Sequence, residues 1–169
     1  VFQTPEIFGD LTLFENVMIP AFAKRDGAFT LNALAGLRGE TSMQEQAMET
    51  LTDLGLGDKS EMQAAQLSRG DKRRLELAMC LVQKPKLLLL DEPTAGMSRH
   101  DTNLTVELLQ QISETGITMV VIEHDMHVVF SLAEKISVMA QGTVIAEGPP
   151  ADIKGDQRVQ DAYLGGAHL

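Results

Sequence analysis

With 169 residues, the chain is long enough for one domain with its own hydrophobic core. Its formal net charge of −10 argues against a surface that binds nucleic acid. No apolar run approaches the roughly 20 residues that span a bilayer, and no signal-peptide pattern opens the sequence, so we expect a cytoplasmic protein whose membrane contact goes through a partner.

The first part of the chain is expected to begin with a strand end and continue into a helix. Residues 1–3, Val-Phe-Gln, have the pattern of a strand end. After a turn, Asp10 or Thr12 is placed to cap a helix, because aspartate and threonine oxygens accept hydrogen bonds from the first free N–H groups. The apolar residues that this helix carries are Leu13, Phe14 and Val17.

Residues 24–46 have a less regular pattern, and we interpret them as a short helix, a loop and the start of the next helix. A short helix is expected at 29–37. Thr41-Ser42 followed by Glu45 is a capping-box pattern, which predicts the start of the next helix. Gly55 and Gly57 are expected to end that helix.

Residues 67–83 predict a helix that begins at a capping serine. Ser68 and Asp71 match a common helix-start pattern, and Gly70 beside them would add an anion site made of backbone N–H groups and the helix dipole. An ordinary capped amphipathic helix also explains the pattern. Cys80, the single cysteine, cannot form an internal disulfide and is expected to be a buried thiol, which suits a reducing compartment. The buried face is expected to hold Leu75, Ala78, Met79 and Val82, and the solvent side Lys72, Arg73, Arg74 and Glu76.

Four consecutive leucines, residues 87–90, predict a strand that is buried on both faces, as in a parallel sheet. Lys84 and Pro85 set where the strand begins. It ends in two adjacent carboxylates, Asp91 and Glu92, and open α/β sheets bind ligands at this carboxyl end. A strand followed by a polar turn would also account for these two residues taken alone.

A second strand is expected to end in polar residues in the same way. A turn at 94–98 leads to a helix that begins at Asp101 and ends at Gly116. Residues 118–122 then predict the next buried strand, which closes on Glu123-His124-Asp125. A lone histidine in this position is usually structural. The residues of the intervening helix that point inward are expected to be Leu104, Leu108 and Ile112.

The last part of the chain predicts a hairpin and short helices. Gln141-Gly142 is a two-residue hairpin turn between strands at 136–139 and 143–146. The helices are expected at 125–133, near 150–154 and near 156–163.

Taken together and in this order, five of these segments resemble the second half of the ATP-binding domain of ABC transporters. The matching segments are Gln3 (the Q-loop), residues 67–71 (the signature), residues 87–93 (the Walker B strand), residues 95–98 (the D-loop) and His124 (the switch histidine). The segment at 24–46 and the ending Ala162-Tyr163-Leu164-Gly165-Gly166 look most like the branched-chain amino-acid importer subgroup. The sequence departs from the family pattern at Arg69, where glycine or an aromatic residue is usual, and at Ser98, where aspartate is usual.

This resemblance implies an α/β fold. It would comprise part of a mostly parallel sheet of the P-loop NTPase type with flanking helices, together with an ABC-type α-helical subdomain. The helical subdomain would cover about residues 4–75 including the signature, the catalytic core about 76–148, and the C-terminal helices 149–169. No GxxxxGK[ST] phosphate loop occurs in the 169 residues, so we expect the chain to be a fragment of a longer protein. We do not expect this fragment to hydrolyse ATP alone.

The resemblance also implies a role for each site residue, with ATP and Mg²⁺ as ligands. Asp91 would hold Mg²⁺ directly or through water, Glu92 would be the general base, and His124 would contact the γ-phosphate. Gln3 would sense the metal and the attacking water. The residues that would meet the ATP of a neighbouring subunit are Ser68, Arg69, Gly70 and Asp71, and Ser98 belongs to the D-loop.

The implied function is to power an importer, for branched-chain amino acids or a similar small polar solute. The implied partners are a second ATPase subunit in a head-to-tail dimer, membrane permease subunits and, indirectly, a substrate-binding protein. The protein would then lie on the inner face of the cell membrane, where the permease holds it. No nucleic-acid partner is expected. Two alternatives remain. One is a soluble ATPase of the DNA-repair or chromosome type, although the stretch before the signature lacks its long heptads. The other is a catalytically inactive fragment.

Overall fold

The computed structural model describes residues 7–26 and 37–163, and the chain divides into two compact units, Val1–Ile122 and Glu123–Leu169. The expected strand end at 1–3, with Gln3, and the expected helix at 29–37, except its last residue, lie outside the described residues. The elements of the first unit are α1 (Leu13–Asp26), α2 (Leu37–Asp53), η1 (Gly57–Lys59), η2 (Ala64–Gln66), α3 (Arg69–Leu81), β1 (Leu87–Asp91), α4 (Arg99–Glu114) and β2 (Thr118–Ile122). Those of the second unit are α5 (Met126–Leu132), β3 (Ile136–Ala140), β4 (Thr143–Gly148), α6 (Pro150–Gly155) and α7 (Gln157–Tyr163).

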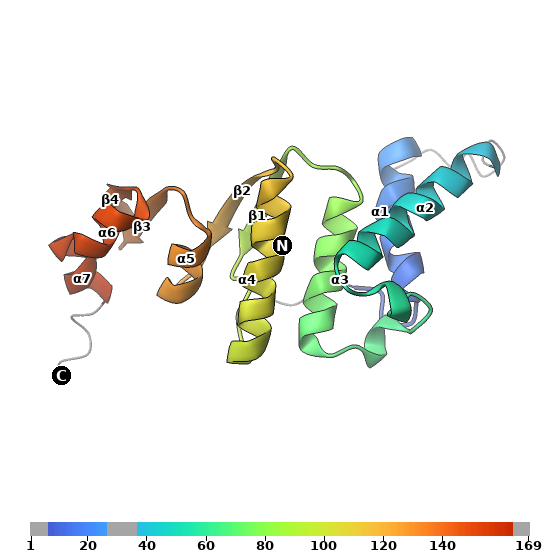
Figure 1. Cartoon of the computed structure of the whole chain (residues 1–169), viewed down its shortest axis with the longest axis horizontal. Helices are drawn as coiled ribbons and strands as arrows, with labels where there is room; N and C mark the ends of the chain where they lie inside the picture. The colour runs from blue at the N-terminus through green and yellow to red at the C-terminus, as the bar shows by residue number, and fades with distance from the viewer. Residues whose placement is uncertain (1–6, 27–36, 164–169) are drawn as a thin grey trace. The chain divides into compact units, whose positions relative to one another are not determined.

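In the first unit, α1 packs against α2 and α3 (Figure 1). Thr12 caps α1 as predicted: its Oγ1 accepts a hydrogen bond from Glu15 N at 3.1 Å, and Glu15 Oε2 accepts one from Thr12 N at 2.8 Å. This reciprocal pair is a capping box, which satisfies two backbone donors that the helix itself leaves unpaired. The helices enclose a core of side chains that are at most 4% exposed, which includes Leu13, Val17, Leu51, Leu54, Leu56 and Leu75.

Helix α2 begins at Leu37, so the predicted start at Thr41-Ser42 is wrong. A threonine inside a helix can bond to a carbonyl one turn earlier, and two threonines of this helix do so: Thr50 Oγ1 donates to Gln46 O and Thr52 Oγ1 to Met48 O, both at 2.8 Å. The helix ends as predicted at Gly55, whose φ is +69° and whose N–H bonds back to Thr52 O at 2.9 Å. Gly57 instead begins η1.

Strands β1 and β2 pair in parallel, in the register Leu87 with Thr118 through Asp91 with Ile122. The prediction that β1 is buried on both faces is wrong, and so is the prediction that β2 is a buried strand. Leu88 and Leu90 are 4% and 2% exposed, whereas the alternate residues of β1 and the outer face of β2 are about half exposed: Leu87, Leu89, Val120 and Ile122. Because successive side chains point to opposite faces of a strand, the described part of the chain covers only one face of this pair.

Helix α4 begins two residues before the predicted Asp101. Ser98 is its N-cap, because the Ser98 Oγ accepts a hydrogen bond from Asp101 N at 3.2 Å. Gly116 follows the helix with φ of +86°, as expected for a glycine just past a helix end. On α3, Cys80 is only partly buried, and burial together with the charge of Glu76 raises the pKa of its thiol.

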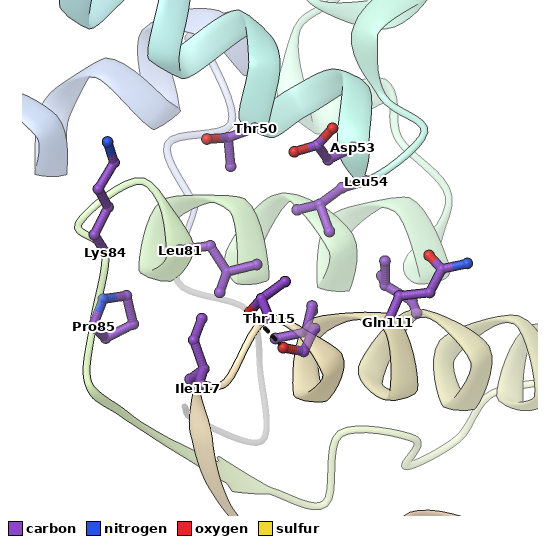
Figure 2. Close-up of a pocket in the computed structure, with 11 residues that line it drawn as sticks. Thr50, Asp53, Leu54, Leu81, Lys84, Pro85, Gln111, Thr115 and Ile117 are labelled. Carbon is purple, nitrogen blue, oxygen red and sulfur yellow. Dashed lines mark hydrogen bonds between the residues drawn. The ribbon is translucent and has the colours of Figure 1, made fainter.

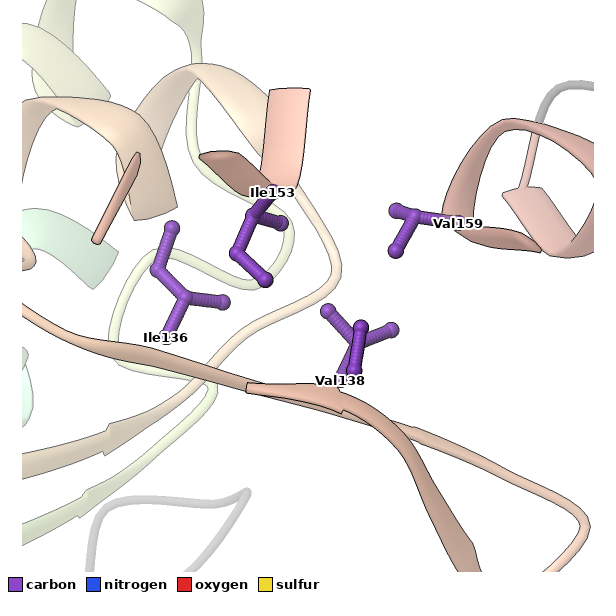
Figure 3. Close-up of a cluster of buried hydrophobic side chains, with 5 residues drawn as sticks. Ile136, Val138, Ile153 and Val159 are labelled. Atoms are coloured by element: carbon purple, nitrogen blue, oxygen red, sulfur yellow. The ribbon is translucent and has the colours of Figure 1, made fainter. Parts of the chain in front are cut away.

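The second unit contains the predicted hairpin, β3 and β4, followed by α6 and α7. Gln141 and Gly142 both have positive φ, +50° and +78°, which is the backbone of a type I′ hairpin turn. Figure 3 shows the small core above the hairpin, which consists of Ile136, Val138, Ala146, Ile153 and Val159. Within residues 7–26 and 37–163, no helix is long and apolar enough to cross a membrane.

Candidate functional site

The predicted signature segment forms the N-terminus of α3. Ser68 caps the helix, and its Oγ accepts a hydrogen bond from Asp71 N at 3.1 Å. The Asp71 carboxylate lies 2.6 Å from Lys59 Nζ and 3.4 Å from Arg74 Nη1. The first N–H groups of an α-helix have no partner within the helix, and they carry the positive end of the helix dipole. This end of α3 can therefore stabilise an anion such as a phosphate group.

The start of α3 lies against the turn that follows β1. The Arg69 guanidinium lies so close to Gly96 that a Cβ there would stand 2.5 Å from Arg69 Nη1 and 2.7 Å from Cζ. Gly96 also has φ of +67°, a backbone conformation that side-chain-bearing residues rarely adopt, and this conformation favours glycine at the position. A Cβ on Gly70 would lie 3.7 Å from Asp101 Oδ1, which places the first turns of α3 and α4 side by side.

Arg73 joins α3 to the end of β1, which corrects the prediction that Arg73 and Glu76 face solvent. These side chains are 7% and 10% exposed, and Arg73 Nη1 donates to Glu76 Oε2 at 2.6 Å. Arg73 Nη2 donates to the backbone oxygens of Asp91 at 3.0 Å and Glu92 at 3.2 Å. A guanidinium has five N–H donors in a fixed plane, so it can be buried where a carboxylate and carbonyls face it.

Asp91 and Glu92 are half-buried at the carboxyl end of β1. Glu92 has φ of +43°, a left-handed conformation that costs a non-glycine residue about 1–3 kcal/mol. Hydrogen bonds to its backbone hold it there: its N–H donates to Ile122 O at 2.8 Å, and its carbonyl accepts from Ala95 N at 3.1 Å as well as from the Arg73 side chain. Such strained residues cluster at functional sites, which makes the carboxyl end of β1 a candidate site.

His124 belongs to the second unit. Its side chain is 70% exposed, whereas that of Glu123 is 1% exposed. The Glu123 carboxylate accepts a hydrogen bond from His124 N at 3.2 Å and lies 4.0 Å from His124 Nδ1. Asp125 then caps α5 by accepting a hydrogen bond from His127 N at 2.8 Å. The imidazole therefore projects from a short segment that is fixed on both sides.

The structure thus brings together, within the first unit, the segments predicted to be the signature, the Walker B carboxylates and the D-loop. Ser68, Arg69, Gly70, Asp71, Asp91, Glu92 and Ser98 lie on adjoining ends of α3, β1 and α4. Ser98, taken from the resemblance as a D-loop residue, is the N-cap of α4. Gln3 lies outside the described residues. Sequence reasoning missed Arg73 and Glu76, although two oppositely charged residues three positions apart on a helix are a recognisable signal for a pair.

The chemistry of these side chains fits a magnesium ion that is held mainly by a nucleotide. Among the described residues, no group of three or more His, Cys, Asp or Glu side chains could hold a metal ion. Mg²⁺ usually binds through one or two carboxylates plus water and substrate phosphates. Asp91, a half-buried carboxylate at the end of a strand, fits this arrangement.

A separate pocket of about 520 Å³ lies in the first unit between α2, the α3–β1 connection and α4 (Figure 2). Its wall includes the buried Leu54, Leu108 and Ile112. Leu81, which also lines it, ends α3, whereas Ser68 precedes the first residue of that helix. A helix of this length is about 20 Å long, so the pocket is remote from the signature.

Comparison with known proteins points to one group. A family model described as "ABC transporter" matches residues 1–95, and one described as "Branched-chain amino acid ATP-binding cassette transporter" matches residues 143–169. The chain is 35% identical to the high-affinity branched-chain amino acid transport ATP-binding protein LivG of Escherichia coli, over 98% of the chain and 67% of that protein. It is 34% identical to BraF of Pseudomonas aeruginosa, which has the same description, with the same coverage.

Solved structures show the same similarity in three dimensions. The ADP conformation of MJ1267, an ATP-binding cassette of an ABC transporter, matches with a TM-score of 0.79 and 29% identity, over 97% of this chain and 66% of that one. CbiO1 from Clostridium perfringens, part of the ABC transporter complex cbiONQ, matches with a TM-score of 0.76 and 28% identity, over 99% of this chain and 64% of that one. The chain therefore spans about two thirds of the length of these relatives.

Proposed function

The chain belongs to the ABC transporter family, in its branched-chain amino acid group, and from this premise we propose that it is the larger part of an ATP-hydrolysing subunit that powers an importer. The transported solute would be a branched-chain amino acid or a similar small polar molecule. The observation that carries the proposal is the junction of α3 with β1, where the signature helix bonds directly to the backbone of Asp91 and Glu92.

The proposed mechanism assigns a task to each of the candidate residues. Phosphoryl transfer depends mainly on positioning and charge stabilisation. Glu92 accepts the proton of the attacking water as general base, and His124 orients that water against the γ-phosphate. Asp91 would hold Mg²⁺, which neutralises charge on the phosphates. The N-terminus of α3, at Ser68 and Gly70, stabilises the γ-phosphate of an ATP bound to a second subunit.

This sharing of sites requires a head-to-tail dimer of ATPase subunits. Coupling to transport further requires permease subunits in the membrane, to which the dimer would bind on the cytoplasmic face. LivG and BraF carry the description of transport ATP-binding proteins, which favours this proposal over a DNA-processing ATPase. Arg69 stands where the family usually has glycine or an aromatic residue, and its guanidinium finds room beside Gly96.

The proposal predicts a difference in ATP affinity between the 169-residue chain and the complete protein to which it corresponds. The chain contains no GxxxxGK[ST] loop, whose N–H groups and lysine make most of the phosphate contacts in such ATPases. Calorimetric titration with ATP·Mg²⁺ should therefore show weak or no binding to the chain and clear binding to the complete protein, which should also hydrolyse ATP. Micromolar binding by the chain alone would contradict the expectation, and a complete protein without ATPase activity would refute the proposed function.

A second prediction concerns the permease, which we propose docks beside residues 7–18. Phe8 is 51% exposed, yet its backbone is fixed, because Asn16 bonds to both its N–H and its carbonyl. Leu13 and Met18 are core residues, so they are unavailable for docking. Phe8→Asp in the complete protein should reduce the yield of permease complex and uncouple hydrolysis from transport, while the unfolding temperature stays unchanged.

The matched control for Phe8→Asp is Val144→Asp, which places the same charge at a similarly exposed apolar residue of the second unit. This variant should copurify with the permease at the wild-type yield. Wild-type copurification and transport by Phe8→Asp would reject the docking site.

A further inference from the structure

Arg73 and Glu76 form a buried ion pair that the proposed mechanism does not use. Arg73 and Glu76 are 6% and 8% exposed as whole residues. Burying a charged pair is costly unless the remaining donors and acceptors are also satisfied. Arg73 meets this condition through Nη2, which donates to the carbonyls of Asp91 and Glu92.

The partners of Arg73 indicate what the pair does. Its two carbonyl acceptors belong to the residue proposed to hold the metal and to the residue proposed as the base. The second of these, Glu92, has the strained φ of +43°, and a strained conformation persists only where its surroundings fix it. Because Glu76 neutralises the guanidinium at 2.6 Å, the pair acts on the backbone by hydrogen bonding and not on the nucleotide by net charge.

We propose that Arg73 is a positioning residue: it holds the Glu92 backbone in the left-handed conformation that directs the carboxylate toward the attacking water, and Glu76 holds Arg73. This inference rests on the proposed function. Arg69 lies against Gly96, at the end of the turn that follows β1. Helix α3 therefore contacts the segment 91–96 at residue 91, through Arg73, and at residue 96, through Arg69. The signature helix and the general base are thereby parts of one hydrogen-bonded block.

The test compares Arg73→Gln and Arg73→Lys with Arg74→Gln in the complete protein. Arg74 is the matched control, because it is the adjacent arginine of the same helix and pairs with Asp71 at 3.4 Å, a carboxylate that Lys59 also holds. Displacing a reacting group by about 1 Å can cost on the order of 10²-fold in rate. We therefore expect Arg73→Gln to lower kcat by roughly 10–100-fold while the KM for ATP stays within about threefold.

Arg73→Lys should recover part of the lost kcat, because its ammonium group can donate to one carbonyl while still pairing with Glu76. Arg74→Gln should stay within about threefold of the wild-type kcat. Guanidinium ion at millimolar concentration should restore activity to Arg73→Ala and leave Arg74→Ala unchanged, a response that a purely structural role would not give.

Three results would overturn the positioning role. The first is a folded Arg73→Gln with kcat equal to that of Arg74→Gln, and the second is a loss of ATP affinity as large as the loss of kcat. The third result applies if Arg73→Gln does not fold. It is an Arg73→Lys variant that has both the wild-type kcat and the wild-type unfolding temperature. The absence of hydrolysis in the wild-type complete protein would instead refute the proposed function, so the two failures are distinguishable.

Discussion

Replacing Glu92 by glutamine in the complete protein is expected to lower steady-state ATP hydrolysis by roughly 10²–10⁴-fold, the usual contribution of a general base. The amide has the shape of the carboxylate but cannot accept the proton of the attacking water. The backbone should keep its position, because the bonds from residue 92 to Ile122, Ala95 and Arg73 are made by its N–H and carbonyl, which the substitution does not change. ATP should therefore remain bound while turnover stops.

Phosphate release and bound nucleotide are both to be measured for this variant, with Glu107→Gln as its control. Glu107 is an exposed glutamate of α4, so the same change there should leave both quantities at the wild-type level. If Glu92→Gln hydrolyses ATP within threefold of the wild-type rate, then Glu92 is not the base.

The substitution Asn16→Leu is expected to lower the free energy of unfolding by about 3 kcal/mol, because it removes three side-chain hydrogen bonds worth about 1 kcal/mol each. Asn16 is fully buried. Its Oδ1 accepts from Phe8 N at 2.8 Å, and its Nδ2 donates to Phe8 O at 3.0 Å and Thr12 O at 2.8 Å. The amide thus ties the loop before α1 to the first turn of that helix.

Thermal and urea unfolding should show this loss for Asn16→Leu as a drop of roughly 6–12 °C in the unfolding midpoint. Gln111→Leu is the control, since Gln111 is exposed on α4 and surface changes usually stay within about 0.5 kcal/mol. Equal unfolding midpoints for the two variants would show that the amide of Asn16 does not stabilise the loop.

Local patterns predicted most of the secondary structure, because they report interactions between residues close in sequence. The caps at Ser68 and Thr12 and the turn at Gln141-Gly142 each depend on two or three neighbouring residues. The start of α2 was predicted wrongly for the same reason: the pattern at Thr41-Ser42 is compatible with a helix start and with a helix interior.

Burial depends on contacts between distant segments, and the sequence therefore predicted it less well. The leucines of β1 indicated burial on both faces, whereas their exposure depends on which segments cover the sheet. Arg73 and Glu76 were assigned to the solvent side because of their charge. Their burial becomes understandable only once the carbonyls of Asp91 and Glu92 are known to lie beside α3.

The candidate site was predicted in part. The resemblance selected residues at the ends of α3, β1 and α4, and the structure brings these ends together. The left-handed conformation of Glu92 had no signal in the sequence, because glycine and not glutamate usually marks such a position. The roles of all these site residues stay predictions, and Gln3 lies outside the described residues.

The structure of the complete Glu92→Gln protein with bound ATP·Mg²⁺ would test the central claim most directly, namely that the carboxyl end of β1 is the hydrolytic centre. The account predicts Mg²⁺ at Asp91 and the γ-phosphate between residue 92 of one subunit and Ser68 of the partner subunit. It also predicts that Arg73 still bonds to the carbonyls of residues 91 and 92. A nucleotide bound away from the end of β1, or a γ-phosphate that no second subunit contacts, would contradict it.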